Sequence, residues 1–154
     1  MSIHSSRSPN VTLAGLAPEE GRAAPVWKRT LYAISAIGFA INALHMLADP
    51  AGWYATVPGV PNTGPFNPHF VRDIGVAYLT LTGLLALAAW RPRWAFPLLL
   101  AVTLYLGLHA GLHLWDIAAA RLPLDHLLVD APGVFLPVLF FAWLAATAYP
   151  HQTH

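Results

Sequence analysis

The sequence contains no cysteine. This absence excludes structural disulfides, thiolate metal sites and catalysis by a cysteine nucleophile. A metal ion would have to be held by imidazole, carboxylate, carbonyl or water ligands. The reactive chemistry of the chain therefore depends mainly on its eight histidines and seven acidic residues.

Charged residues are scarce as well. They make up 10% of the 154 residues, whereas a typical soluble domain has about a quarter. Hydrophobic residues make up 56% and the net charge is +1, so the chain offers no basic surface for nucleic acid and no strong attraction for a charged macromolecule. This composition predicts that lipid surrounds much of the protein.

Four apolar segments are long enough to cross a membrane as helices, which takes about 20 residues at a rise of about 1.5 Å per residue. They are residues 26–48, 69–90, 94–115 and 131–149. In lipid an open chain satisfies its backbone polar groups only as a helix. We therefore predict an all-α, four-transmembrane-helix bundle over residues 26–150, after a flexible polar tail over residues 1–25 that lacks the apolar core of a secretion signal.

The fourth segment and the first long loop carry distinct local signals. Asp130 followed by Ala131 and Pro132 is typical of a helix cap and first turn, so Asp130 is interpreted as a cap rather than a ligand. Pro137 is expected to kink or loosen this helix. Residues 49–70 contain many prolines and glycines, with turns expected at residues 58–59 and 62–64. The loop is either a lid over the bundle or a compact segment at the membrane interface.

The basic residues predict the orientation of the chain. Six of the eight lie on the side of the N-terminus and of the loop that joins the second and third spans: Arg7, Arg22, Lys28, Arg29, Arg91 and Arg93. Arg72 and Arg121 lie on the other side. Because cytoplasmic loops carry an excess of Lys and Arg, both termini are expected in the cytoplasm, with the first and third loops facing outward.

Polar residues gather near the outward ends of three spans. Side chains four residues apart share one face of a helix, which pairs His69 with Asp73 and His109 with His113. Polar groups at membrane depth are costly and usually functional, and imidazole with carboxylate suits Zn, Cu or Fe. We therefore predict a transition-metal site with five candidate ligands: His45, His69, Asp73, His109 and His113.

A metal-binding imidazole needs a partner for its second ring nitrogen. Five nearby residues are candidates for this orienting role: Asn42, Tyr105, Asp116, Asp125 and His126. A hydrogen-bonded polar cluster without metal would explain the same pattern. Haem is the alternative cofactor, with His45 and either His109 or His113 as axial ligands.

The functional hypotheses follow from these alternatives. A metal site would suit a membrane enzyme that activates water or dioxygen toward a lipophilic or small substrate, although no residue stands out as catalytic. The alternatives are an accessory or structural subunit of a larger membrane complex, and a b-type haem protein. Membrane lipid, other membrane subunits and further copies of the chain are the expected partners.

The chain resembles the DoxX-like group of small four-helix bacterial membrane proteins. Three runs carry the resemblance: FNPHFVRDIGVAYLTLTGLLALAAW at 66–90, HAGLHLWD at 109–116 and DAPGVFLPVLFFAWL at 130–144. It extends over most of residues 27–149. The resemblance implies a four-helix bundle and a multi-pass location in the bacterial inner membrane, but it assigns no catalytic residue.

Overall fold

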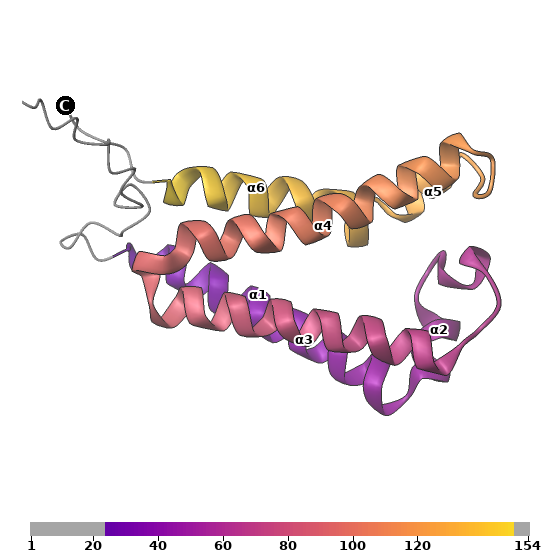
Figure 1. The fold of residues 1–154 in the computed structure, drawn as a ribbon, viewed down its shortest axis with the longest axis horizontal. Coiled ribbons are helices and arrows are strands. Elements are labelled where there is room, and N and C mark those ends of the chain that lie inside the picture. Colours follow the sequence, from indigo (N-terminus) through magenta and orange to yellow (C-terminus); the bar gives the residue numbers. More distant parts are fainter. Residues whose placement is uncertain (1–23, 150–154) are drawn as a thin grey trace, which may run out of the picture.

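The computed structural model describes residues 24–149, and the regular elements of this part of the chain are all helical (Figure 1). Within these residues, four helical segments are long and apolar enough to cross a membrane. Their main helices are α1 (Val26–Ala48), α3 (Pro68–Trp90), α4 (Ala95–Ala118) and α6 (Leu136–Ala148). The predicted all-α class and the four spans are confirmed. The tail predicted for residues 1–25 lies almost wholly outside the described residues.

Short elements connect the long helices: α2 (Pro50–Thr56), η2 (Val60–Thr63), η3 (Pro92–Trp94), α5 (His126–Val129) and η4 (Ala131–Phe135). Side-chain caps define two of the starts. The carboxylate of Asp49 accepts a hydrogen bond from the Gly52 amide at 2.9 Å, at the start of α2. The Asn67 side chain accepts bonds from the first amides of α3. Both caps satisfy backbone donors that a helix N-terminus leaves unpaired.

The long helices form two hairpins, α1 with α3 and α4 with α6, linked through η3 (Figure 1). The backbones of α1 and α3 approach each other closely at Gly75. A Cβ at this position would lie 3.1 Å from Cβ of Met46 and 3.3 Å from the carbonyl oxygen of Ala43. Small residues permit such contacts between membrane helices, where close packing replaces the hydrophobic effect as the source of stability.

The apolar core lies in the halves of the helices nearest η3. It contains the first halves of α1 and α4 and the second halves of α3 and α6, and its fully buried large side chains include Tyr32, Leu85, Leu99 and Leu144. This end of the bundle is also closed by basic side chains. Nζ of Lys28 donates to the carbonyl oxygen of Thr147 at 2.6 Å, where the negative end of the α6 dipole favours a cation.

The other end of the bundle is open. The α1–α3 and α4–α6 hairpins diverge toward α2 and α5 (Figure 1). Here the segment before α6 forms a π-helical turn at Ala131–Phe135, in which the amide of Phe135 reaches back five residues to the carbonyl oxygen of Asp130. Pro137 lacks the amide hydrogen that would continue a regular helix. The predicted loosening of this helix is therefore confirmed.

The basic residues divide between the two ends as predicted. Lys28, Arg29, Arg91 and Arg93 lie on elements at the closed end, and Arg72 and Arg121 lie near the open end. Arg7 and Arg22 lie outside the described residues. The orientation inferred from this asymmetry remains a prediction.

Candidate functional site

A cavity of about 1030 Å³ occupies the open end of the bundle, between the two hairpins. Its walls come from α1, α3, α4 and α6, and the loop between α1 and α3 contributes to its lining from Trp53 to Asn67. Most of the lining is apolar and much of it is aromatic. The aromatic residues of the lining, apart from histidine, are Phe39, Trp53, Tyr54, Phe70, Tyr78, Phe140 and Phe141.

The loop between α1 and α3, the predicted lid, forms part of the cavity wall. Trp53 of α2 donates from Nε1 to Oδ1 of Asn42 at 2.9 Å, which fastens the loop to α1. The predicted turn is present at Gly59, which has φ of +83°. A Cβ at Gly59 would lie 3.0 Å from Cγ1 of Val129, so the turn requires glycine both for its backbone conformation and for its contact with α5.

The shortest contact between two polar side chains in the wall joins α4 to the segment before α6. Nδ1 of His113 lies 2.8 Å from Oδ2 of Asp130, and the two side chains are 15% and 6% exposed. An ionised carboxylate can only accept hydrogen bonds, so Nδ1 of His113 is the donor. In neutral His113 the Nε2 atom then has a free lone pair with which to accept a hydrogen bond or bind a metal ion.

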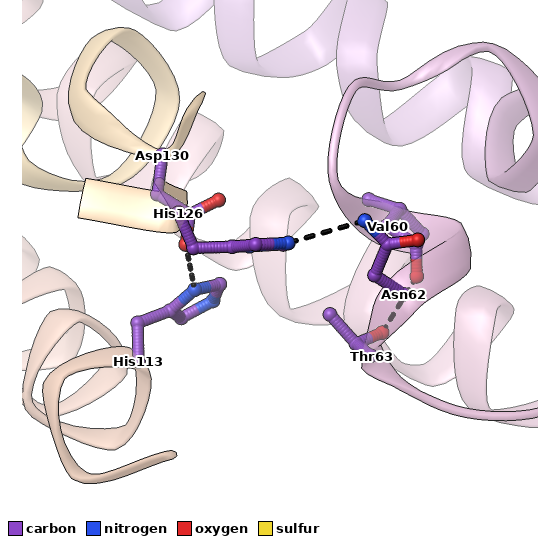
Figure 2. A network of polar contacts seen from close by, with 6 residues as sticks. All are labelled: Val60, Asn62, Thr63, His113, His126 and Asp130. Atoms are coloured by element: carbon purple, nitrogen blue, oxygen red, sulfur yellow. Dashed lines mark hydrogen bonds and ion pairs between the residues drawn. The ribbon is translucent and has the colours of Figure 1, made fainter. Parts of the chain in front are cut away.

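His126 approaches the same carboxylate oxygen, and its ring extends toward Asn62 of the loop between α1 and α3 (Figure 2). Its Nδ1 is 3.4 Å from Oδ2 of Asp130, without the geometry of a hydrogen bond. Its Nε2 is 3.2 Å from the amide nitrogen of Asn62, which belongs to η2. Because an amide nitrogen donates, Nε2 accepts and the proton of neutral His126 is on Nδ1, facing Asp130. Asp130 thus lies between two imidazoles, one of which contacts the lid.

The predicted pairing of His109 with His113 is present. The two rings lie 4.7 Å apart between centroids in an edge-on arrangement, and both residues line the cavity. The ring of Tyr105, one turn earlier on α4, is stacked at 6.4 Å on that of His109. This face of α4 therefore presents two imidazoles to the cavity.

The structure does not bring His45, His69 and Asp73 to this cavity. His45 is exposed because the neighbouring Met46 occupies the buried face of α1. His69 and Asp73 do pair with each other, at 3.3 Å, but their side chains are 82% and 57% exposed. They point outward because Val71 and Gly75 take the buried positions of α3.

The candidate orienting residues have different positions. Asn42 holds Trp53, and His126 adjoins Asp130. Asp116 lines the cavity and forms an ion pair with Arg121 at 3.0 Å. Asp125 is exposed at the start of α5, and Tyr105 is stacked on His109.

No three His, Asp or Glu side chains within residues 24–149 are grouped in a way that could hold a metal ion. The structure does supply the adjacent pair His109 and His113, and the carboxylate of Asp130 orients the second of these. The arrangement of a carboxylate, a histidine and a free Nε2 atom is common at metal sites. The metal site of five ligands remains a prediction. Two of the five residues, His109 and His113, line the cavity side by side.

The sequence analysis missed Asp130 as part of this site. Asp130 occupies the predicted cap position before Ala131 and Pro132, but its side chain makes no capping hydrogen bond. The carboxylate contacts His113 and His126 instead. The spacing of four residues between His126 and Asp130 was a signal that could have identified this pair, because such residues share a helix face.

No family model, curated protein or solved structure matches the chain. The resemblance to the DoxX-like group therefore remains a prediction, and the geometry of the cavity is the basis for the proposals that follow.

Proposed function

We propose that this is a multi-pass membrane protein that binds a small lipophilic molecule with a polar head group in the cavity at its open end. The observation that carries the proposal is the combination of a cavity of about 1030 Å³, lined mainly by apolar and aromatic groups, with a buried carboxylate–imidazole pair in its wall. Pockets for small molecules typically have such apolar walls and a few placed polar groups.

His113 is the proposed anchor for the head group. Its Nδ1 donates to Asp130, which fixes the plane of the ring. Its Nε2 can then accept a hydrogen bond from a hydroxyl group of the ligand. The same atom could take a proton from such a hydroxyl, because Asp130 would stabilise the imidazolium that forms. The pair therefore suits binding and, as a further step, acid–base chemistry on the bound molecule.

A transition-metal centre is the second candidate function. The observation that favours it is the contact between His113 and Asp130 beside the ring of His109, since a carboxylate commonly orients a metal-binding imidazole. Two protein ligands would leave positions for water or substrate, as a catalytic metal requires. Zn, Cu or Fe at this pair would be consistent with a membrane enzyme acting on a lipophilic substrate.

The placement of the protein is part of the proposal. The four apolar helices support a multi-pass arrangement. The excess of basic residues at the closed end supports cytoplasmic termini, and the resemblance in three runs supports the bacterial inner membrane. The open end with its cavity would then face outward. Assembly with other membrane subunits or with further copies of the chain is compatible with the apolar outer surface.

Photolabelling with 4-hydroxybenzophenone tests the proposal, because this neutral lipophile carries one hydroxyl group and crosslinks to its surroundings on irradiation. The purified chain in lipid nanodiscs is irradiated with the probe, and peptide mass spectrometry locates the labelled residues. We expect labelling of cavity residues such as Phe140 and Trp53. His113→Ala should lower the labelling by 4-hydroxybenzophenone more than the labelling by benzophenone, which lacks the hydroxyl.

Two glycine variants provide the matched control. Gly38 lines the cavity and Gly83 does not, and a Cβ at either position would meet no other atom within 4 Å. Gly38→Leu should fill part of the cavity and abolish its labelling, whereas Gly83→Leu should leave the labelling unchanged. Labelling confined to the lipid-facing side chains, equal in both variants, would contradict the proposed function.

A further inference from the structure

The cavity wall contains acidic side chains but no permanently basic ones among the described residues. Among the described residues the lining includes two carboxylates, those of Asp116 and Asp130, and neither lysine nor arginine. Its remaining ionisable groups are imidazoles and tyrosine hydroxyls. The wall therefore has no permanent positive charge to attract an anion.

One of the two carboxylates is already neutralised. Asp116 forms its ion pair with Arg121, whose side chain is 63% exposed and lies outside the lining. Asp130 differs, because within residues 24–149 its ion-pair partners are the imidazoles of His113 and His126. His126 is neutral when its Nε2 accepts from Asn62. With His113 also neutral, Asp130 contributes a full negative charge near the cavity in a poorly hydrated position.

The aromatic groups of the wall add to this effect. Tyr78 and Phe39 lie 5.4 Å apart between ring centroids, and Phe39 also stacks with Phe141 at 5.7 Å. All three rings line the cavity. The faces of aromatic rings attract cations, and the attraction is stronger when the cation has lost its water. A cavity whose wall contains these aromatic rings and one carboxylate without a permanent cationic partner is suited to a hydrophobic cation.

We infer that the ligand of this cavity is a lipophilic cation, such as an amine or a quaternary onium ion with apolar substituents. The inference rests on the proposed function, since it specifies the charge of the molecule bound there. The aromatic rings would surround the apolar substituents, and the charge of Asp130 would balance that of the cation. A lipophilic anion of the same shape would be rejected, because the described wall provides no cationic side chain to pair with it.

Tetraphenylphosphonium and tetraphenylborate form a suitable pair of probes, because they have nearly the same size and shape but opposite charge. Binding of each ion to the full chain in detergent is measured by equilibrium dialysis. Binding to Gly38→Leu gives the partition into the micelle and is subtracted. We expect specific binding of tetraphenylphosphonium to the wild type and none of tetraphenylborate.

Asp130→Asn then tests the source of the selectivity. Asparagine keeps an oxygen that can accept from Nδ1 of His113 but removes the charge, so the fold should be retained. Loss of a unit charge close to the ligand should weaken tetraphenylphosphonium binding by about tenfold or more. Asp73→Asn removes the same charge from an exposed position outside the cavity, and it should leave the affinity unchanged.

Three results would overturn the inference. One is specific binding of tetraphenylborate at least as tight as that of tetraphenylphosphonium; another is an equal loss of affinity in Asp130→Asn and Asp73→Asn. The third is failure of both ions to bind while 4-hydroxybenzophenone still labels the cavity, which would leave the proposed function intact. If neither ion binds and the label also misses the cavity, the proposed function fails together with the inference.

Discussion

The side-chain amide of Asn62 lies 3.2 Å from Nε2 of His126, although the two residues are 64 positions apart in the sequence. This contact joins the loop that covers the cavity to the segment that supplies Asp130 (Figure 2). Displacement of the loop would therefore disturb the surroundings of the carboxylate, and loss of the carboxylate would loosen the loop. Cavity, lid and polar pair form one connected unit.

The first prediction concerns the stability that Asp130 provides. Asp130→Ala should lower the free energy of unfolding by about 2 kcal/mol, because it leaves the largely buried Nδ1 donor of His113 without an acceptor. Unfolding by dodecyl sulfate in mixed micelles measures this quantity. Asp73→Ala, which breaks an exposed pair, should change it little. A loss in Asp130→Ala as small as that in Asp73→Ala would show that the contact with His113 contributes nothing to stability.

A second prediction concerns the hold of the lid on α5. Gly59→Ala should detach the loop, because a side chain there is strained at positive φ and meets Val129. The chain has no cysteine, so Val60→Cys introduces a single thiol at a half-buried position of the cavity lining. Gly59→Ala should raise the rate at which a maleimide labels this thiol. The rise is about fivefold if the substitution destabilises the closed position of the loop by about 1 kcal/mol.

Gly133→Ala is the control for the lid experiment. Gly133 also lines the cavity, but a Cβ there would have open space around it. With Gly133→Ala added to the Val60→Cys protein, the labelling rate should equal that of the Val60→Cys protein alone. A rate that stays at the parent value in Gly59→Ala would mean that the loop is held by contacts other than the turn at Gly59.

The third prediction addresses the packing of α1 against α3. Gly75→Leu should destabilise the bundle by about 1–3 kcal/mol, because a larger side chain would have to push Met46 and Leu47 away. The thermal unfolding temperature in detergent reports the loss. Gly83→Leu, on the same helix but facing open space, should unfold near the wild-type temperature. A similar decrease in both variants would assign the effect to leucine itself rather than to the helix contact.

A fourth prediction follows for metal binding. Retention of Zn, Cu or Fe by the purified protein should depend on His109 and His113, which are adjacent, and not on His45 or His69, which lie outside the cavity. Elemental analysis of the four alanine variants beside the wild type measures the dependence. Loss of metal in His45→Ala or His69→Ala would contradict this assignment. Equal metal content in all the variants would remove both imidazoles of α4 from the list of ligands.

The fold was largely predictable because lipid imposes a simple rule on the sequence. Each span needs a long apolar run, and each such run in residues 26–149 corresponds to a helix of the structure. The π-helical turn before α6 was only partly predictable: Pro137 indicated a disturbance, but its form depends on how the segment after α5 enters the bundle.

The site was predicted less completely. The direction of a side chain around its helix and the path of a loop both decide which residues meet, and the sequence specifies neither of them fully. His109 and His113 share a face by their spacing alone, so the sequence was sufficient for them. After Gly38 and Asn42, the same face of α1 can be continued by either His45 or Met46, because both follow Asn42 by about one helical turn. Their side chains differ in direction by about 100°, so they cannot both point into the bundle. Met46 takes the buried place. The contact of Asp130 with His113 depends on the path of the third loop, which no periodicity specifies.

The last span, which begins with the π-helical turn, is short, and its length affects the fit of the protein to a bilayer. The span from Ala131 to Ala148 has 18 residues, whereas α1 has 23; at about 1.5 Å per residue these lengths are about 27 Å and 35 Å. A helix shorter than the hydrocarbon layer is accommodated by local thinning of the lipid. Such thinning beside α6 would bring the head groups of nearby lipids closer to the level of Asp130, and with them any amphiphile dissolved among the acyl chains.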